Sequence, residues 1–126
     1  MVVDPLVMPI GAMGTAGVQV MQLVRRLREE LKVNTTCGAS NVSFGLPNRD
    51  GVNAAFLTMA MASGLTSAIT NPLHDSIMQA VMGGDVMLGK DSNCAKWIRK
   101  YREPSTKNNS SGAGRRERRR ARPRVA

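Results

Sequence analysis

Apolar residues in the first third of the chain follow two patterns, short runs typical of buried strands and a spacing typical of one helix face. Val2-Val3 opens an apolar strand, which we expect to end near Asp4-Pro5 because proline cannot donate to a sheet ladder. A glycine-rich loop follows, and residues 33–37 then form a β-branched run that predicts a second buried strand. Between them, helical spacing predicts an amphipathic helix with the stripe Val20, Leu23, Val24, Leu27 and Leu31.

The same two patterns continue toward the C-terminus. Asp50 suits the N-cap of a helix over residues 51–63, and Gly64 suits its C-terminal end. Residues 65–70 predict a third strand, Asn71-Pro72 is a favourable helix start, and Gly83-Gly84 is expected to end that helix. A last helix is expected from about Ser92. The predicted apolar faces comprise Val52, Phe56, Met59 and Ser63 in the first of these helices and Leu73, Ile77, Ala80 and Val81 in the second.

Strands and helices therefore alternate three times along the chain. Alternation with helices long enough for right-handed crossovers predicts an α/β fold with a parallel sheet. Loops that follow such strands lie together at the carboxyl edge of the sheet, where ligands bind in this class of fold. The pattern alone fits three units of a barrel as well as half of a doubly wound sheet.

Charge divides the chain into two parts. The segment from Lys107 onward holds eight of the 18 Lys and Arg residues and one acid, Glu117, so it carries +7 of the total +9. We expect one folded domain over residues 1–104 and a disordered Arg-rich tail over residues 105–126, because the tail has no apolar period. The tail has no interleaved aromatic residues, so nucleic-acid binding through it is only a weak alternative to a solvated tail without a dedicated partner.

Cysteine and histidine content excludes several kinds of site. Cys37 and Cys94 have no neighbours at metal-ligand spacing, so we expect two reduced thiols, no metal site and a cytoplasmic location. His74 is the single histidine, which rules out a His-based zinc site or a catalytic triad within this chain. The N-terminus does not look like a signal peptide, and Gly, Pro, Asn, Thr and Ser interrupt the two longest uncharged runs, so no membrane span is expected.

The candidate chemistry lies in residues 38–49, directly after the second predicted strand. This loop is dense in amide and hydroxyl groups and carries one guanidinium, Arg49, but no ionisable general base. Such a loop suits holding a polar heterocycle by hydrogen bonds better than generating a nucleophile.

The run Ser-Asn-Val-Ser-Phe-Gly-Leu-Pro-Asn-Arg over residues 40–49, together with Val-Val-Asp-Pro-Leu over residues 2–6, resembles the pterin-binding methyltransferases. These are the methyltetrahydrofolate:corrinoid protein methyltransferases and the folate module of cobalamin-dependent methionine synthase. The resemblance runs from about Val2 to about Arg102 and covers roughly the last third of the family's domain. It implies the last three βα units of a TIM (β/α)8 barrel.

The resemblance also implies roles for particular residues. Asn41 would be the catalytic residue, hydrogen-bonded to N5 of the pterin, the atom that loses the methyl group, and Asp4 would bind the pterin ring. Arg49 would face either the carboxylate-bearing tail of the folate or the loop backbone, and Ser43 would orient the loop. Phe44 matches the methionine synthase folate modules, whereas corrinoid iron-sulfur protein methyltransferases have a polar amide there, so the methyl acceptor stays open.

The implied activity is methyl transfer from 5-methyltetrahydrofolate, or a related methylated pterin, to the cobalt of a separate corrinoid protein that carries the cobalamin. One alternative is a dihydropteroate-synthase-like enzyme, although that family expects Ser-Arg-Lys where this chain has Ser-Asn-Val. Another is a non-catalytic barrel fragment with a polyanion-binding tail. A closed barrel needs about 250 residues, so we expect the isolated chain to be inactive and to aggregate, self-associate or remain partly molten. Its expected partners besides the corrinoid protein are a second copy, in a homodimer, or the missing N-terminal barrel portion.

Overall fold

The computed structural model describes residues 1–102, which form an α/β structure with mostly helices and a small parallel sheet. Strand β1 spans Val2–Val3 and β2 spans Asn34–Thr35, separated by helix α1 at Ala16–Glu29. A 3-10 helix, η1 at Ala39–Ser43, leads to α2 at Arg49–Ser63. Helix α3 spans Asp75–Met87, and the short η2 at Ser92–Cys94 precedes α4 at Ala95–Tyr101.

The sheet is parallel, as the alternation predicted. Val2 pairs with Asn34 and Val3 with Thr35, and the backbone N–H of Thr36 donates to the carbonyl of Val3 at 3.1 Å. The third predicted strand, residues 65–70, forms only an isolated parallel bridge between Gly38 and Ile69. Backbone hydrogen bonds still hold this extended segment beside β2, from Ser67 to Thr35 at 3.0 Å and from Ile69 to Cys37 at 2.7 Å. Three parallel extended segments are therefore present, in the expected order.

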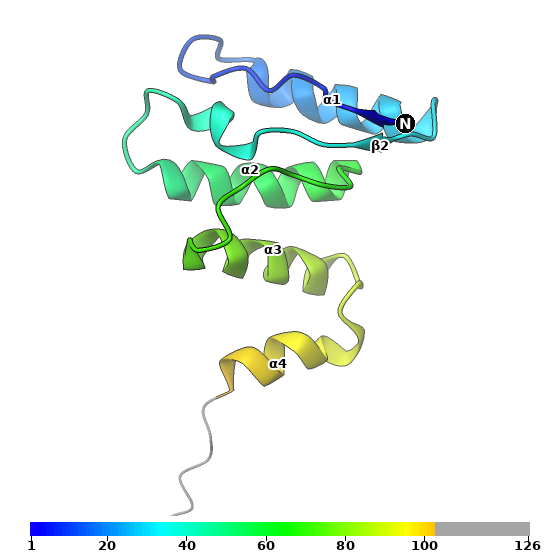
Figure 1. The fold of residues 1–126 in the computed structure, drawn as a ribbon, viewed down its shortest axis with the longest axis vertical. Helices are drawn as coiled ribbons and strands as arrows, with labels where there is room; N and C mark the ends of the chain where they lie inside the picture. The colour runs from blue at the N-terminus through cyan, green and yellow to red at the C-terminus, as the bar shows by residue number, and fades with distance from the viewer. Residues whose placement is uncertain (103–126) are drawn as a thin grey trace, which may run out of the picture.

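The helices form a layer behind these segments. In Figure 1, α1, α2 and α3 lie side by side, β1 and β2 cross one side of the layer, and α4 lies beyond α3. The loops that follow β1, β2 and the third extended segment all lie at the left of this view. The carboxyl ends of the strands thus share one edge, although three segments do not establish a closed barrel.

The core fills the space between the helices and the extended segments. Its largest fully buried apolar side chains are Leu57, Ile77 and Val24, each with no more than 2% of its surface exposed. The predicted stripe of α1 is correct at Val20, Val24 and Leu27, which are buried. It is wrong at Leu23 and Leu31, which are exposed, because Leu31 lies beyond the end of α1 at Glu29 and Leu23 lies within α1 but outside its buried face.

Two predicted helix starts are wrong because the chain turns before each helix. Asn48, in the left-handed conformation at φ 50°, is the N-cap of α2, so Asp50 lies in the first turn instead of capping it. The Oδ1 atom of Asn71 accepts the backbone N–H of Leu73 at 2.9 Å, which makes a local turn, and α3 begins only after His74. The end of α2 at Gly64 is correct, and this glycine has φ 113°.

The predicted end of α3 at Gly83-Gly84 is also wrong, since α3 continues to Met87. A Cβ atom on Gly84 would stand 3.0 Å from Cε of Met61 in α2. Gly84 therefore allows α2 and α3 to pack closely, which explains a glycine in a helix interior. Met59 of α2 and Leu73, both expected on apolar faces, are exposed. The boundary at residue 104 and the Arg-rich tail lie outside the described residues.

Candidate functional site

Two of the expected site residues follow neighbouring parallel strands. Asp4 comes directly after β1 and Asn41 lies in η1, after β2. Both residues are exposed at the carboxyl edge of the sheet. One carboxylate oxygen of Asp4 accepts the backbone N–H of Leu6 at 2.8 Å, which fixes the side chain in a turn and leaves its second oxygen without a partner among residues 1–102.

The position of Asn41 depends on Gly38. A Cβ atom on Gly38 would stand 3.1 Å from Nδ2 of Asn41 and 3.5 Å from its Oδ1, so the carboxamide lies against the bare Cα of the glycine. The backbone N–H of Asn41 donates to the carbonyl of Gly38 at 3.2 Å, closing the turn. Within residues 1–102 the carboxamide itself makes no hydrogen bond, and it is exposed. It is therefore free to donate to and accept from a ligand.

Ser43 and Arg49 hold this loop from inside. Ser43 is fully buried, and its hydroxyl donates to the carbonyl of Ser40 at 3.2 Å and accepts Nε of Arg49 at 3.0 Å. A second guanidinium nitrogen of Arg49 donates to the same Ser40 carbonyl at 2.8 Å. Of the two roles expected for Arg49, the contact with the loop backbone is therefore present. Arg49 clamps η1 to the first turn of α2, directly beside Asn41.

Phe44 follows Ser43 but points away from the core. Its side chain is 67% exposed, and the guanidinium carbon of Arg49 lies 5.8 Å from its ring centroid, within the range of a weak cation–π contact. Phe44 thus presents an exposed aromatic surface at the same edge as Asn41. Such a surface suits stacking on a planar ring or contact with another protein.

A polar cleft of about 290 Å³ lies between the first turns of α2 and α3 and includes Arg49. His74 Nδ1 lies 3.4 Å from a carboxylate oxygen of Asp50, joining the two helix starts. The cleft also contains Asn53, whose Oδ1 is buried without a hydrogen-bond partner in the described residues. The sequence reasoning did not single out Asn53. The available signal was an amide one helical turn after Arg49, in a segment otherwise dominated by apolar residues.

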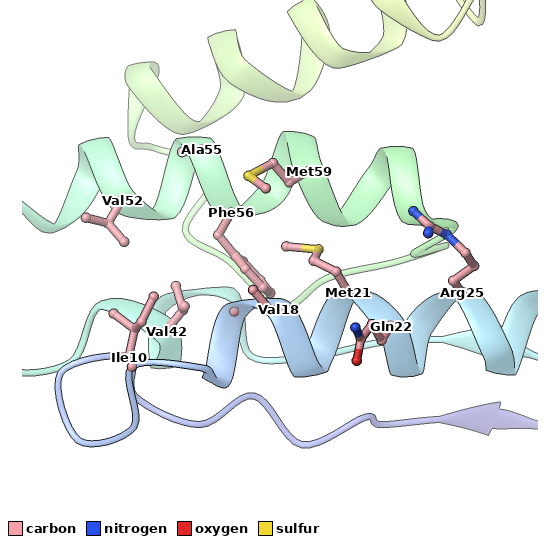
Figure 2. Close-up of a pocket in the computed structure, with 12 residues that line it drawn as sticks. Ile10, Val18, Met21, Gln22, Arg25, Val42, Val52, Ala55, Phe56 and Met59 are labelled. Carbon is pink, nitrogen blue, oxygen red and sulfur yellow. The ribbon is translucent and has the colours of Figure 1, made fainter.

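A second cleft, of about 510 Å³, lies between α1 and α2 and contains none of the expected site residues. Figure 2 shows Phe56, Met21 and Val18 projecting into the space between the two helices. The walls are mostly apolar, and Val18 and Met59 are more than half exposed. This cleft suits contact with an apolar surface. The polar residues expected to bind a ligand lie instead at the carboxyl ends of the strands.

Residues 1–102 show no metal-binding cluster and no activation of the Cys37 thiol. No group of three or more His, Cys, Asp or Glu side chains there is placed to hold a metal ion. Cys37 is free, and burial together with the Asp4 charge raises the pKa of its thiol to about 11, so the thiol is not an active nucleophile near neutral pH. None of the helices in this part of the chain is long and apolar enough to cross a membrane.

Comparison with known proteins shows a similarity over most of the chain. Over 102 residues, which are 80% of this chain, the sequence is 32% identical to a methylcorrinoid:tetrahydrofolate methyltransferase of Eubacterium limosum. This similarity confirms the resemblance to the pterin-binding methyltransferases. The chain spans 38% of the length of that relative. No protein-family model matches the chain.

Proposed function

From this similarity we propose that the chain forms part of a methyltransferase that moves a methyl group between N5 of a tetrahydrofolate and the cobalt of a corrinoid protein. The observation that carries the proposal is the exposed carboxamide of Asn41, held against Gly38 at the carboxyl edge and without a partner in the described residues. A ligand at this edge could both donate hydrogen bonds to this carboxamide and accept them from it.

Asn41 would act on the leaving nitrogen of the pterin. A tertiary amine leaves poorly unless N5 carries positive charge. A carboxamide can accept a hydrogen bond from protonated N5 and, after rotating, donate one to the neutral nitrogen that forms. An interaction that strengthens as the bond breaks lowers the barrier, whereas one of equal strength in both states does not. By microscopic reversibility, the same contact assists transfer in the opposite direction.

The other residues would bind and orient the pterin. The second carboxylate oxygen of Asp4 is available to accept hydrogen bonds from the amino-pyrimidine edge of the ring. Phe44 offers its exposed ring to the substrate or to the corrinoid protein. Ser43 and Arg49 are positioning residues in this proposal, because their hydrogen bonds to each other and to Ser40 hold the turn that carries Asn41.

The direction of transfer is a separate matter. The sequence predicted the methylated pterin as methyl donor. The name of the relative gives a methylcorrinoid as donor and tetrahydrofolate as acceptor. Both directions use the same pair of atoms, N5 and cobalt, so the proposed role of Asn41 holds for either. The corrinoid cofactor would arrive on a partner protein.

We propose that further strands complete the pocket. Val2 on the outer strand and Ile69 on the third extended segment are 59% and 70% exposed, which suits contact with additional barrel units. A ligand held only by Asp4 and the loop after β2 would stay largely in water, and half-open sites of this kind bind weakly.

A chimera tests the proposal directly. In the Eubacterium limosum methyltransferase, residues 1–102 of this chain would replace the matching segment. We expect the chimera to transfer methyl groups between methylcorrinoid and tetrahydrofolate, followed by the absorbance change of the corrinoid. Asn41→Ala should slow transfer about hundredfold, comparable to losing one transition-state hydrogen bond, and should weaken tetrahydrofolate binding less than tenfold.

Asn34→Ala is the matched control, because Asn34 is also an exposed asparagine but lies at the start of β2, away from the carboxyl edge. We expect it to leave rate and affinity within twofold. An Asn41→Ala variant that loses affinity and rate equally would contradict the leaving-group role. A folded chimera that binds no tetrahydrofolate would contradict the proposed function itself.

A further inference from the structure

Positive charge gathers at the C-terminal end of the described structure. Residues 90–102 contain five basic residues and a single acid, Asp91, whereas residues 1–89 contain five basic residues and six acids. Four of the basic side chains are exposed on or directly after α4, namely Lys96, Arg99, Lys100 and Arg102. These four residues are called the basic patch below. A protein whose body is near neutral thus carries a local cationic surface on one short helix.

The single acid, Asp91, offsets only part of this charge, because five basic residues stand against it. The two carboxylate oxygens of Asp91 accept the backbone N–H groups of Lys96 and Trp97, each at 3.0 Å, and only 7% of the residue is exposed. These hydrogen bonds, first that from Lys96 and then that from Trp97, lower the pKa of the carboxyl group. Asp91 therefore stays ionised, fixes the first turn of α4 and attracts Lys96 and Arg99. The helix that presents the basic patch is therefore anchored.

Of the two aromatic residues of α4, Trp97 packs on α3 and Tyr101 borders the patch. A Cβ atom on Gly83 of α3 would stand 3.7 Å from the Trp97 ring, so the tryptophan lies over the glycine. The rings of Trp97 and Tyr101 lie 4.5 Å apart between centroids. Tyr101 is 38% exposed, and the ammonium of Lys100 lies 5.8 Å from its ring centroid. A partly exposed aromatic face thus stands next to lysine and arginine side chains.

We propose that α4 is a docking surface for single-stranded nucleic acid, with the basic patch on the phosphates and Tyr101 against a base. Phosphates bind Lys and Arg with release of counterions, and an aromatic face stacks on any unpaired base. A lipid bilayer fits less well, because α4 has only seven residues and its tryptophan, Trp97, already packs on α3. The chain leaves α4 into a sequence with eight more basic residues and one acid from Lys107 onward, which extends the charge that a long polyanion would meet.

The test uses the whole 126-residue chain and a fluorescent 20-nucleotide oligouridine, with anisotropy measured at several salt concentrations. We expect Arg99→Gln with Lys100→Gln to weaken binding at least tenfold at low salt. The slope of log affinity against log salt should become less steep by about 1.4, or 0.7 for each lost phosphate contact. Tyr101→Leu should weaken binding about three- to tenfold and leave the salt slope unchanged.

The matched control removes the same charge elsewhere. Arg25→Gln with Lys32→Gln takes two exposed cations from the region of α1 and should leave binding within twofold. Circular dichroism should show the same helix content in every variant. The proposal is overturned if the control weakens binding as much as the α4 variant, or if Tyr101→Leu has no effect. Equal affinity for anionic phospholipid vesicles, polyglutamate or duplex RNA would also overturn it.

Discussion

Two loops reach the same edge of the sheet, but they are held there in different ways. The loop after β2 is fastened from inside by buried Ser43 and by three hydrogen bonds among Ser43, Arg49 and the Ser40 carbonyl. The loop before α3 has a local turn at Asn71 and the pair of His74 with Asp50, whose side chains are 49% and 47% exposed. The first loop is preorganised, whereas the second depends on the helix that follows it.

This difference explains why the first loop is the better candidate for precise chemistry. A side chain that must meet one atom of a substrate needs a backbone that does not move, and hydrogen bonds anchored on a buried side chain help to supply that rigidity. Exposed ion pairs contribute little to stability, so the second loop can shift at small cost. Three substitutions and a change of pH test this difference between the two loops.

Ile77→Ala should have the largest effect. Ile77 lies in the first turn of α3 and is 1% exposed, so its removal leaves a cavity beneath the second loop. We expect a loss of about 2–5 kcal/mol in the free energy of unfolding, measured by urea denaturation. A loss below about 1 kcal/mol would show that the polar contacts of this loop, and not the core under α3, hold it in place.

Alkaline pH should weaken the strand that leads into the first loop. Burial raises the pKa of the Cys37 thiol from 9.0 to about 11. The folded state therefore keeps its proton longer than the unfolded state, so this contribution is intact below pH 9 and is lost as the pH rises toward 11. We expect about 2 kcal/mol to be lost by pH 11. Cys37→Ala should remove this part of the pH dependence, and an unchanged slope would contradict the assignment.

Arg49→Met should loosen the first loop. It removes two hydrogen bonds from a charged donor, one to Ser43 and one to the Ser40 carbonyl. We expect a cost of about 1–2 kcal/mol in urea denaturation, reduced from the buried value because the arginine is exposed. Arg49→Lys should restore less than half, since one ammonium cannot reproduce the fork of the guanidinium. Full rescue by lysine would mean that charge alone matters at this position.

His74→Gln should have the smallest effect. The substitution removes an exposed ion pair and keeps a side chain able to hydrogen-bond to Asp50. We expect a change within about 0.5 kcal/mol in the same denaturation assay. A cost equal to that of Arg49→Met would end the contrast between the two loops.

The sequence predicted the order and direction of the main elements, because strand and helix periods and Gly64 are local signals. It failed where side chains redirect the chain or where packing between helices overrides local preference. Asn71 bonds to the backbone two residues on and delays α3 to Asp75. Gly84 stays inside α3 because Met61 of α2 occupies the space that a side chain would need. The position of Gly84 cannot be predicted without the neighbouring helix, whereas the turn at Asn71 is a local alternative to an earlier helix start.

The same distinction between local sequence signals and packing between elements applies to the candidate site. Asp4 and Asn41 could be placed at one sheet edge from strand order alone, and the structure puts both there. Their proposed contacts with a pterin stay predictions. The sequence reasoning left two roles open for Arg49, because nothing local shows that Ser43 turns inward to meet it. Asn53 was missed, since its burial depends on how the starts of α2 and α3 meet.

Gly38 controls the orientation of a side chain that is not its own. In a mutational scan for loss of methyl transfer, we expect Gly38→Ala to score alongside Asn41 although position 38 contributes no side chain to a substrate. The added methyl group would stand 3.1 Å from Nδ2 of Asn41 and force the amide to turn. A second substitution that shortens the residue at position 41 would relieve the crowding without restoring the amide. Substitutions at the two positions would therefore be coupled, because a side chain at position 38 would crowd the carboxamide at position 41.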